Sequence, residues 1–148
     1  MPRLLGNDYS VYAIVDQPLF ATDAGGLAGF VRAMGAPGDR NLVSFYFDAG
    51  LAYKGPFGRK GDTVGIGFGY AQIGTAARLL DRDTATFTGT AFPVRSRETV
   101  LEITYQYAVD ALPWLQLQPD FQYITAPGGG ILNPNAPGQK IGSAGSSA

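Results

Sequence analysis

Glu98–Val109 reads ETVLEITYQYAV, and apolar and polar residues alternate along most of this stretch. Successive side chains of a β-strand point to opposite faces of the sheet, so the pattern predicts a strand with one apolar and one polar face. The apolar set contains Leu101, Ile103, Tyr105, Tyr107 and Val109. The polar set contains Glu98, Glu102, Thr104 and Gln106. The stretch therefore predicts an all-β protein in which each strand separates two different environments.

The same period of two recurs along the chain. It is clear in Leu42–Lys54, Asp62–Ala71 and Trp114–Ile124, and weaker in Tyr9–Gln17 and Leu27–Met34. Each segment is near the ~9–11 residues that a tilted strand needs to cross a bilayer. We therefore predict an antiparallel up-and-down meander of six strands. Pro119 cannot donate to a strand ladder, so we expect a bulge or a local break there.

The connections differ in length in a way that orients the meander. Four are short and rich in turn-forming residues: Pro18–Gly26, Gly35–Asn41, Gly55–Gly61 and Asp110–Pro113. Two are long, Gly74–Arg97 and Ala126–Gly142, and they fall on the same side of a meander. Membrane barrels have short periplasmic turns and longer extracellular loops, so we expect both long loops outside. The apolar-face tyrosines then lie near the two membrane interfaces, at Tyr53, Tyr107, Tyr70 and Tyr123.

The composition excludes several classes of function. The chain has no cysteine and no histidine, which removes thiol nucleophiles, His-based triads and Cys/His zinc sites. Its net charge of −1 gives no basic field for nucleic acid. Charged residues make up 16% of the chain, against about 25% in soluble domains. We therefore expect neither an enzyme nor a cofactor.

The order of several motifs resembles a known family. Three motifs lie between Pro93 and Gly142: PVRSRETVLEITYQ, PWLQLQPDFQYI and PGGGILNPNAPGQKIG. They are preceded by VYAIVDQ, FVRAMGAPGDRNLVSFYFDAGLAYKG and DTVGIGFGYAQI. Together they resemble the carbohydrate-selective porin family (OprB-like). The resemblance implies a single-chain outer-membrane barrel of about sixteen strands that passes glucose and other sugars by diffusion.

The resemblance also suggests that this chain is a part of such a barrel. We expect residues 1–142 to form its C-terminal portion as a single, incomplete domain, and residues 143–148 (SAGSSA) to form a disordered tail. The implied partners are a carbohydrate solute, outer-membrane lipid and further copies of the barrel in a trimer. No nucleic acid is expected.

A sugar channel needs hydrogen-bonding side chains on its inner wall, and the polar faces of the strands supply them. The candidates for pore-lining or sugar-contacting residues are Arg32, Tyr46, Asp48, Glu98, Glu102, Gln106, Gln118 and Asp120. The plainer interpretation is that any one of these only solvates a wet wall or forms an ion pair across strands.

Three alternatives remain open from the sequence. A soluble ligand-binding barrel would turn its apolar face inward, but the polar faces carry few lysines. A truncated porin without function follows if the barrel cannot close. Asp81 and Asp83 are spaced like calcium ligands, although the stretch lacks the glycine and later ligands of an EF-hand loop, and we expect a solvated loop or a plug there.

Overall fold

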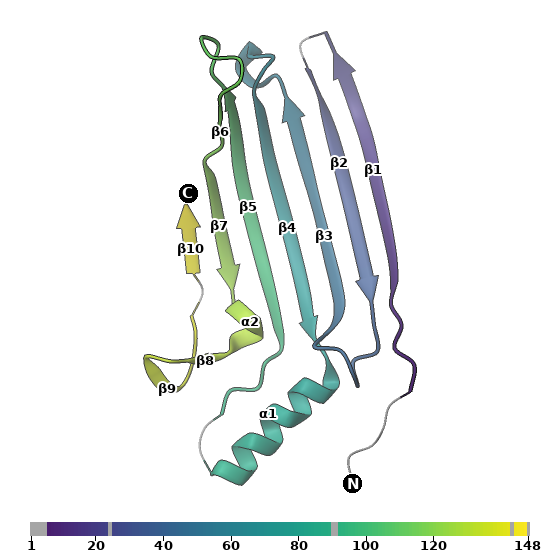
Figure 1. Cartoon of the computed structure of the whole chain (residues 1–148), viewed down its shortest axis with the longest axis vertical. Coiled ribbons are helices and arrows are strands. Elements are labelled where there is room, and N and C mark those ends of the chain that lie inside the picture. Colours follow the sequence, from purple (N-terminus) through teal and green to yellow (C-terminus); the bar gives the residue numbers. More distant parts are fainter. Residues whose placement is uncertain (1–5, 24, 90–91, 143, 148) are drawn as a thin grey trace.

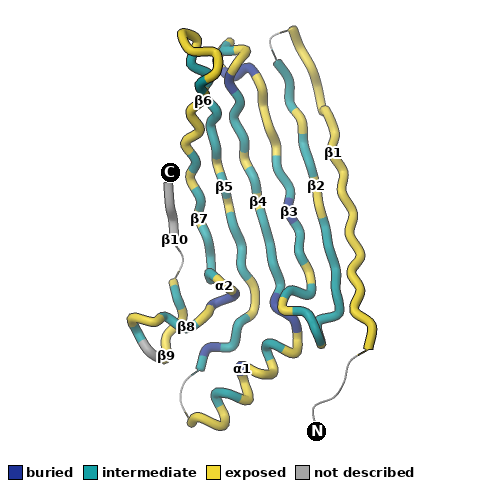
Figure 2. Tube along the Cα trace, in the orientation of Figure 1, coloured by how far each residue is buried: buried dark blue, intermediate teal, exposed yellow. Residues whose placement is uncertain are grey.

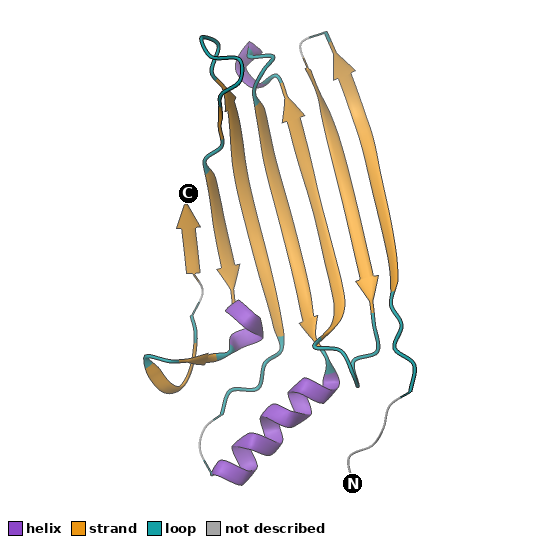
Figure 3. Cartoon of the chain, viewed as in Figure 1, coloured by secondary structure: helices purple, strands orange, loops and turns teal. Residues whose placement is uncertain are grey.

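The structure, a computed structural model, describes residues 6–23, 25–89, 92–142 and 144–147. One large antiparallel sheet dominates it, and a helix lies beyond one end of the sheet (Figures 1 and 3). The long strands are β1 (Val11–Thr22), β2 (Gly25–Gly35), β3 (Val43–Lys54), β4 (Thr63–Ile73) and β5 (Arg97–Ala108). The shorter ones are β6 (Gln116–Leu117), β7 (Asp120–Thr125) and β10 (Ala144–Ser147), while β8 (Leu132–Asn133) and β9 (Ala136–Lys140) form a separate hairpin.

Each long strand pairs with the next one in the sequence. The order in the sheet is β1-β2-β3-β4-β5-β7-β10. The short strand β6 also pairs with β5, at a different part of β5 from β7. The predicted antiparallel meander of six strands is confirmed, with β6 and β7 together forming the sixth strand. The interruption between them falls at Pro119, whose carbonyl still accepts from the Tyr105 amide at 3.1 Å. The proline therefore interrupts the sixth strand, but the chain at Pro119 remains hydrogen-bonded to β5.

The two ends of the sheet differ. One end, called the turn end here, carries the β1–β2 turn, the β5–β6 turn and the β3–β4 turn with its short helix η1 (Pro56–Gly58) (Figure 1). The opposite end, called the loop end, carries the β2–β3 turn, helix α1 (Thr75–Thr88), and the short turn α2 (Pro127–Gly130) with the β8–β9 hairpin. The two long connections thus lie at the same end, as the sequence predicts.

The sheet has almost no core of the kind that a water-soluble domain builds. Among the described residues, Ile73 is the one buried hydrophobic side chain. Large apolar side chains remain exposed over the sheet, and β1 is exposed along its whole length (Figure 2). The register places one set of them on a single face: Val15, Val31, Leu51, Ile66, Phe68, Leu101, Ile103, Phe121 and Tyr123. An apolar face of this extent requires an apolar surrounding.

Aromatic pairs mark both ends of this apolar face. Phe20 and Tyr53 have ring centroids 6.3 Å apart near the turn end, and Phe45 and Tyr70 are 6.2 Å apart near the loop end. These are distances at which aromatic rings attract each other. Their positions are typical of the aromatic belts at the two interfaces of a membrane barrel. No helix within the described residues has both the length and the apolar character needed to cross a membrane.

Three local predictions differ from the structure. Pro18–Gly26 was expected to be a connection, but β1 continues to Thr22. Proline is tolerated at a β-bulge, and the register of β1 against β2 shifts between Pro18 and Phe20. The Gly74–Arg97 connection contains the helix α1, which alternation did not reveal. The tail was expected to be disordered, whereas residues 144–147 form β10 beside β7; residues 143 and 148 lie outside the described part.

Candidate functional site

The polar face of the sheet is built from rows of cross-strand partners. In one row Arg32 of β2 lies opposite Asp48 of β3, which lies opposite Gly69 of β4. In the next row, Phe30 lies opposite Gly50, and the row continues through β4 to Glu102 of β5. Partners in a row share a face, so these side chains all project to the same side of the sheet.

Arg32 and Asp48 form the central ion pair of this face. The Arg32 Nε donates to Asp48 Oδ1 at 3.1 Å and to Oδ2 at 3.0 Å, and Nη2 also donates to Oδ2. The Asp48 side chain is 9% exposed, while that of Arg32 is 51% exposed. Asp48 therefore fixes one edge of the guanidinium and leaves its remaining N–H groups toward the open side of the face. No other described residue accepts a hydrogen bond from them.

Glycines at alternate positions of β4 leave the middle of this face without side chains. A Cβ at Gly67 would have no heavy atom within 4 Å, and one at Gly69 would meet only Val100 Cβ at 3.9 Å. β3 and β5 lie on either side of β4, about 9–10 Å apart from strand to strand. The glycines of β4 therefore form the base of a groove between side chains of β2 and β3 on one side and of β5 on the other.

Phe30 covers Gly50 at the edge of this groove. A Cβ on Gly50 would lie 2.6 Å from Phe30 Cε1 and 2.9 Å from the Ile66 carbonyl oxygen, so only glycine leaves room for the ring. The Arg32 guanidinium carbon lies 5.0 Å from the centre of the same ring. The two side chains together present an apolar surface beside charged hydrogen-bond donors.

The opposite side of the groove carries two carboxylates of β5. Glu102 accepts from Gln122 Nε2 at 2.6 Å, and Glu98 accepts from the amide of Gly128 in the α2 turn. Each keeps acceptor capacity for another donor, because a carboxylate has about four lone-pair sites. Glu98 thus also anchors a loop, a role that alternation alone does not reveal.

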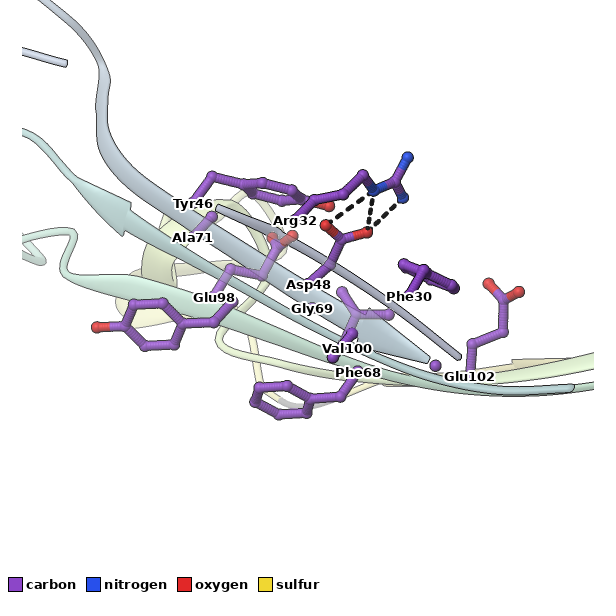
Figure 4. A pocket seen from close by; sticks show the side chains of 13 residues that line it. Phe30, Arg32, Tyr46, Asp48, Phe68, Gly69, Ala71, Glu98, Val100 and Glu102 are labelled. Atoms are coloured by element: carbon purple, nitrogen blue, oxygen red, sulfur yellow. Dashed lines mark hydrogen bonds and ion pairs between the residues drawn. The ribbon is translucent and has the colours of Figure 1, made fainter. Parts of the chain in front are cut away.

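The groove has a volume of about 390 Å³ and gathers five of the eight predicted residues: Arg32, Tyr46, Asp48, Glu98 and Glu102. Figure 4 shows these side chains above the sheet, with the ring of Phe68 on the opposite side. Gln106, Gln118 and Asp120 lie outside the groove, toward the turn end. Gln106 donates to Gln116 at 2.5 Å, Gln118 donates to Thr104 at 3.2 Å, and Asp120 lies opposite Thr104. That all eight contact a solute stays a prediction.

Sequence reasoning missed Phe30, since an aromatic residue in an apolar stretch looks like part of the lipid-facing set. Two signals could have revealed it. Phe30 and Arg32 have the same parity along β2, so they share a face. The glycine at position 50 lies opposite Phe30 in the β2–β3 register, where its missing side chain leaves room for a ring.

At each end of the sheet, an ion pair with a buried aspartate joins a connecting segment to β5 or to the segment that leads into it. At the loop end, Asp81 of α1 is 3% exposed and accepts from the Arg95 Nε, Nη2 and backbone amide at 2.8–3.2 Å. Desolvation would raise the pKa of the Asp81 carboxyl, but these hydrogen bonds outweigh it and hold that pKa below its ordinary 3.8. The helix α1 is thereby tied to the segment that leads into β5.

At the turn end, Asp62 is fully buried and joins the β3–β4 turn to β5. It accepts from Arg59 Nε at 2.7 Å, Tyr105 Oη at 2.6 Å and the Ala108 amide at 3.0 Å. Here too desolvation acts to raise the pKa of the carboxyl, and the three hydrogen bonds lower it below 3.8. Both acids serve structure, and among the described residues no group of three or more acids that could hold a metal ion occurs.

Comparisons with known proteins agree with this geometry. The family described as carbohydrate-selective porin, OprB family, matches residues 2–142. A solved structure titled "High pH structure of Pseudomonas putida OprB" superposes with a TM-score of 0.80 at 22% sequence identity. The match covers 95% of this chain and 34% of that one, so this chain spans about a third of the solved protein's length. No curated protein matches the chain.

The family match extends over nearly the whole chain, while the structural match at this low identity establishes the fold alone. Members of the family are β-barrel porins of the bacterial outer membrane and are not enzymes. The chain belongs to the OprB family of carbohydrate-selective porins.

Proposed function

We propose that this chain forms part of the wall of a channel through which carbohydrates such as glucose diffuse passively across the outer membrane. Residues 1–142 would constitute the C-terminal part of the barrel, with the polar face toward the pore and the apolar face toward lipid. The observation that carries the proposal is the groove over the glycines of β4, because it offers hydrogen-bonding groups on both sides of an open path.

The chemistry of the groove suits a neutral polyol. Carboxylates on β5 accept hydrogen bonds from hydroxyl groups, and the Arg32 guanidinium donates to them. Asp48 balances the charge of Arg32, so the pair does not form an isolated cation that would retain anions. The exposed surface of Phe30 or Tyr46 offers a contact for the C–H face of a sugar ring. Weak binding of this kind lets a solute enter and leave, which diffusion through a channel requires.

A water-soluble ligand-binding barrel is a weaker candidate. Its apolar face would have to form an interior core, yet the apolar face of this sheet remains exposed and one buried hydrophobic side chain is present among the described residues. Assembly of the complete barrel into a trimer also stays a prediction, which chemical cross-linking of the native protein in outer membranes would test.

Conductance measurements in planar bilayers test the proposal. The chain forms only part of a wall, so after refolding in detergent it should produce discrete current steps when several copies complete a barrel, and glucose should reduce these steps. A variant with Gly67→Trp places an indole over the base of the groove and should lower the step size, because a side chain there meets open space. The matched control Leu101→Trp lies on the opposite face and should leave the steps unchanged.

Two outcomes would contradict the proposal. If β-type circular dichroism persists but no current steps appear, the chain is not a conducting unit, and the hypothesis of a truncated, inactive porin replaces it. If both tryptophan variants lower the current equally, the groove does not line the path of the solute.

A further inference from the structure

A second pocket lies at the loop end, between α1 and the segment that follows α2. It has a volume of about 320 Å³ and is lined by Asp81, Phe92, Pro93, Arg95, Ile131 and Leu132. This volume is at the lower limit of the range of roughly 300–1,000 Å³ that small-molecule sites occupy. The space therefore suits a ligand of the size of a monosaccharide better than a larger one.

The polar part of this pocket is a guanidinium held in one orientation. Asp81 binds Arg95 through Nε and Nη2, and it also accepts from the Arg95 amide at 2.9 Å. The remaining N–H groups on the Nη1 side have no acceptor among the described residues, and the Arg95 side chain is 25% exposed. An arginine fixed along one edge presents its other N–H groups at a defined angle, which favours directional hydrogen bonds to a ligand.

The charges that line the pocket discriminate between ligand classes. Lys140 does not line it, and its Nζ donates to the Val94 carbonyl at 3.3 Å. The buried carboxylate of Asp81 compensates the cation, so the pair is formally neutral. A phosphate or another anion would gain attraction from Arg95 but meet the negative charge of Asp81 close behind it. A neutral hydroxyl group meets only an oriented donor. The remaining lining, an aromatic ring, a proline and two aliphatic side chains, offers apolar contact for the C–H groups of a sugar ring.

The pocket is adjacent to the groove on the polar face. Arg95 lines the pocket and Glu98 lines the groove, and three residues span at most about 11 Å of chain. The α2 turn joins the two sites, since Gly128 donates to Glu98 and the Gly129 carbonyl accepts from the Ser96 amide at 2.8 Å. The two sites are therefore neighbours that share the α2 turn as a common support.

We propose that the pocket formed by Asp81, Phe92, Arg95 and Ile131 is a binding subsite for a neutral monosaccharide at the loop end, placed in series with the groove. The inference rests on the proposed function, because it assigns the same solute class to a second site. Solute binds the loop-end subsite first and then transfers to the groove. Two weak sites in series favour passage over retention.

Arginine side-chain signals in 15N-edited NMR spectra test this directly on the full chain in detergent micelles. Titration with D-glucose should shift the Arg95 Nε signal in a saturable way, and it should also shift that of Arg32 if the groove binds sugar. Inorganic phosphate at the same concentrations should leave Arg95 unchanged. The Arg59 Nε signal, at the opposite end and bonded to Asp62, reports whether the fold is intact.

A filling variant separates the two sites. Ile131 is 40% exposed, so Ile131→Trp can place an indole into the pocket without removing the ion pair, and it should weaken the glucose response of Arg95 at least tenfold. The Arg32 response should persist. The matched control is Leu80→Trp, an exposed position of α1 that does not line the pocket, and it should change neither response.

Each contrary result has a distinct meaning. If glucose shifts Arg32 but not Arg95, the loop-end subsite is refuted while the proposed function stands. If glucose shifts neither, both are refuted. If phosphate shifts Arg95 and glucose does not, the pocket binds anions and the proposal is wrong. If Ile131→Trp leaves the Arg95 response unchanged with Arg59 unperturbed, the sugar binds elsewhere, and the assignment of this pocket fails.

Discussion

Replacing Gly50 with alanine tests the packing that shapes the groove. The new methyl group would lie 2.6 Å from Phe30 Cε1 and 2.9 Å from the Ile66 carbonyl oxygen. The backbone oxygen cannot move without disturbing the β3–β4 ladder, so the Phe30 ring has to move. Strain of this kind costs about 1–3 kcal/mol. Gly67→Ala is the matched control, because its methyl group meets no heavy atom within 4 Å and Gly67 lies directly opposite Gly50.

The comparison of the two variants isolates this strain. Both substitutions reduce the freedom of the unfolded chain, which stabilises a strand position by about 0.5–1 kcal/mol. That contribution cancels in the difference, so Gly50→Ala should be less stable than Gly67→Ala by about 1–3 kcal/mol. With a urea m-value of about 2 kcal/mol/M, the midpoints should differ by about 0.5–1.5 M. The assay is reversible urea unfolding of both variants in lipid vesicles, followed by circular dichroism.

A second substitution shows whether the ring causes the cost. Adding Phe30→Ala to Gly50→Ala removes the closest contact, so the double variant should recover part of the stability, with a coupling energy above about 0.5 kcal/mol. Equal midpoints for Gly50→Ala and Gly67→Ala would refute the reasoning, because they would mean that Phe30 does not rest on Gly50.

Three further predictions follow from the charged groups. Arg32→Lys keeps the charge but loses the bidentate geometry, so glucose should reduce the channel current less than in the parent protein. Tyr105→Phe removes a hydrogen bond to the buried Asp62 and should lower the urea midpoint, whereas the exposed Tyr12→Phe should not. The pKa of Asp81 is lowered in the fold, so its contribution to stability is complete above its ordinary pKa of 3.8 and is lost as the pH falls through the folded-state value. The protection of the α1 amides, relative to their intrinsic exchange rates at each pH, should fall over that range. Asp81→Asn should remove this pH dependence of the protection.

Alternation predicted the sheet because it follows from strand geometry alone. The segment Glu98–Val109 and the other alternating segments of the chain predict the number of strands, their faces and their order. The register of the sheet keeps Arg32, Asp48 and Glu102 on one face. Pro18 is misleading because proline often marks a connection, whereas here the register of β1 against β2 shifts between Pro18 and Phe20 and the strand continues. The pairing of a strand with its neighbour is a tertiary property that a local pattern does not contain.

The groove and the loop end were less predictable for the same reason. Which polar residues gather depends on cross-strand register, so Glu98 and Tyr46 meet in the groove while Gln106 and Asp120 do not. The helix α1 has no alternating pattern, and its start depends on Gly74, where a Cβ would lie 2.1 Å from the Asn41 carbonyl oxygen. Contacts between segments distant in the sequence decide both features.

The orientation of the two faces is the claim on which the account depends, and spin labelling of neighbouring residues tests it most directly. The chain has no cysteine, so single cysteines at positions 101 and 102 can carry labels without other changes. Leu101→Cys on the apolar face should give a label accessible to oxygen dissolved in lipid, and Glu102→Cys on the polar face one accessible to a water-soluble nickel complex. The opposite pattern, or equal exposure of both labels to the aqueous reagent, would contradict the account.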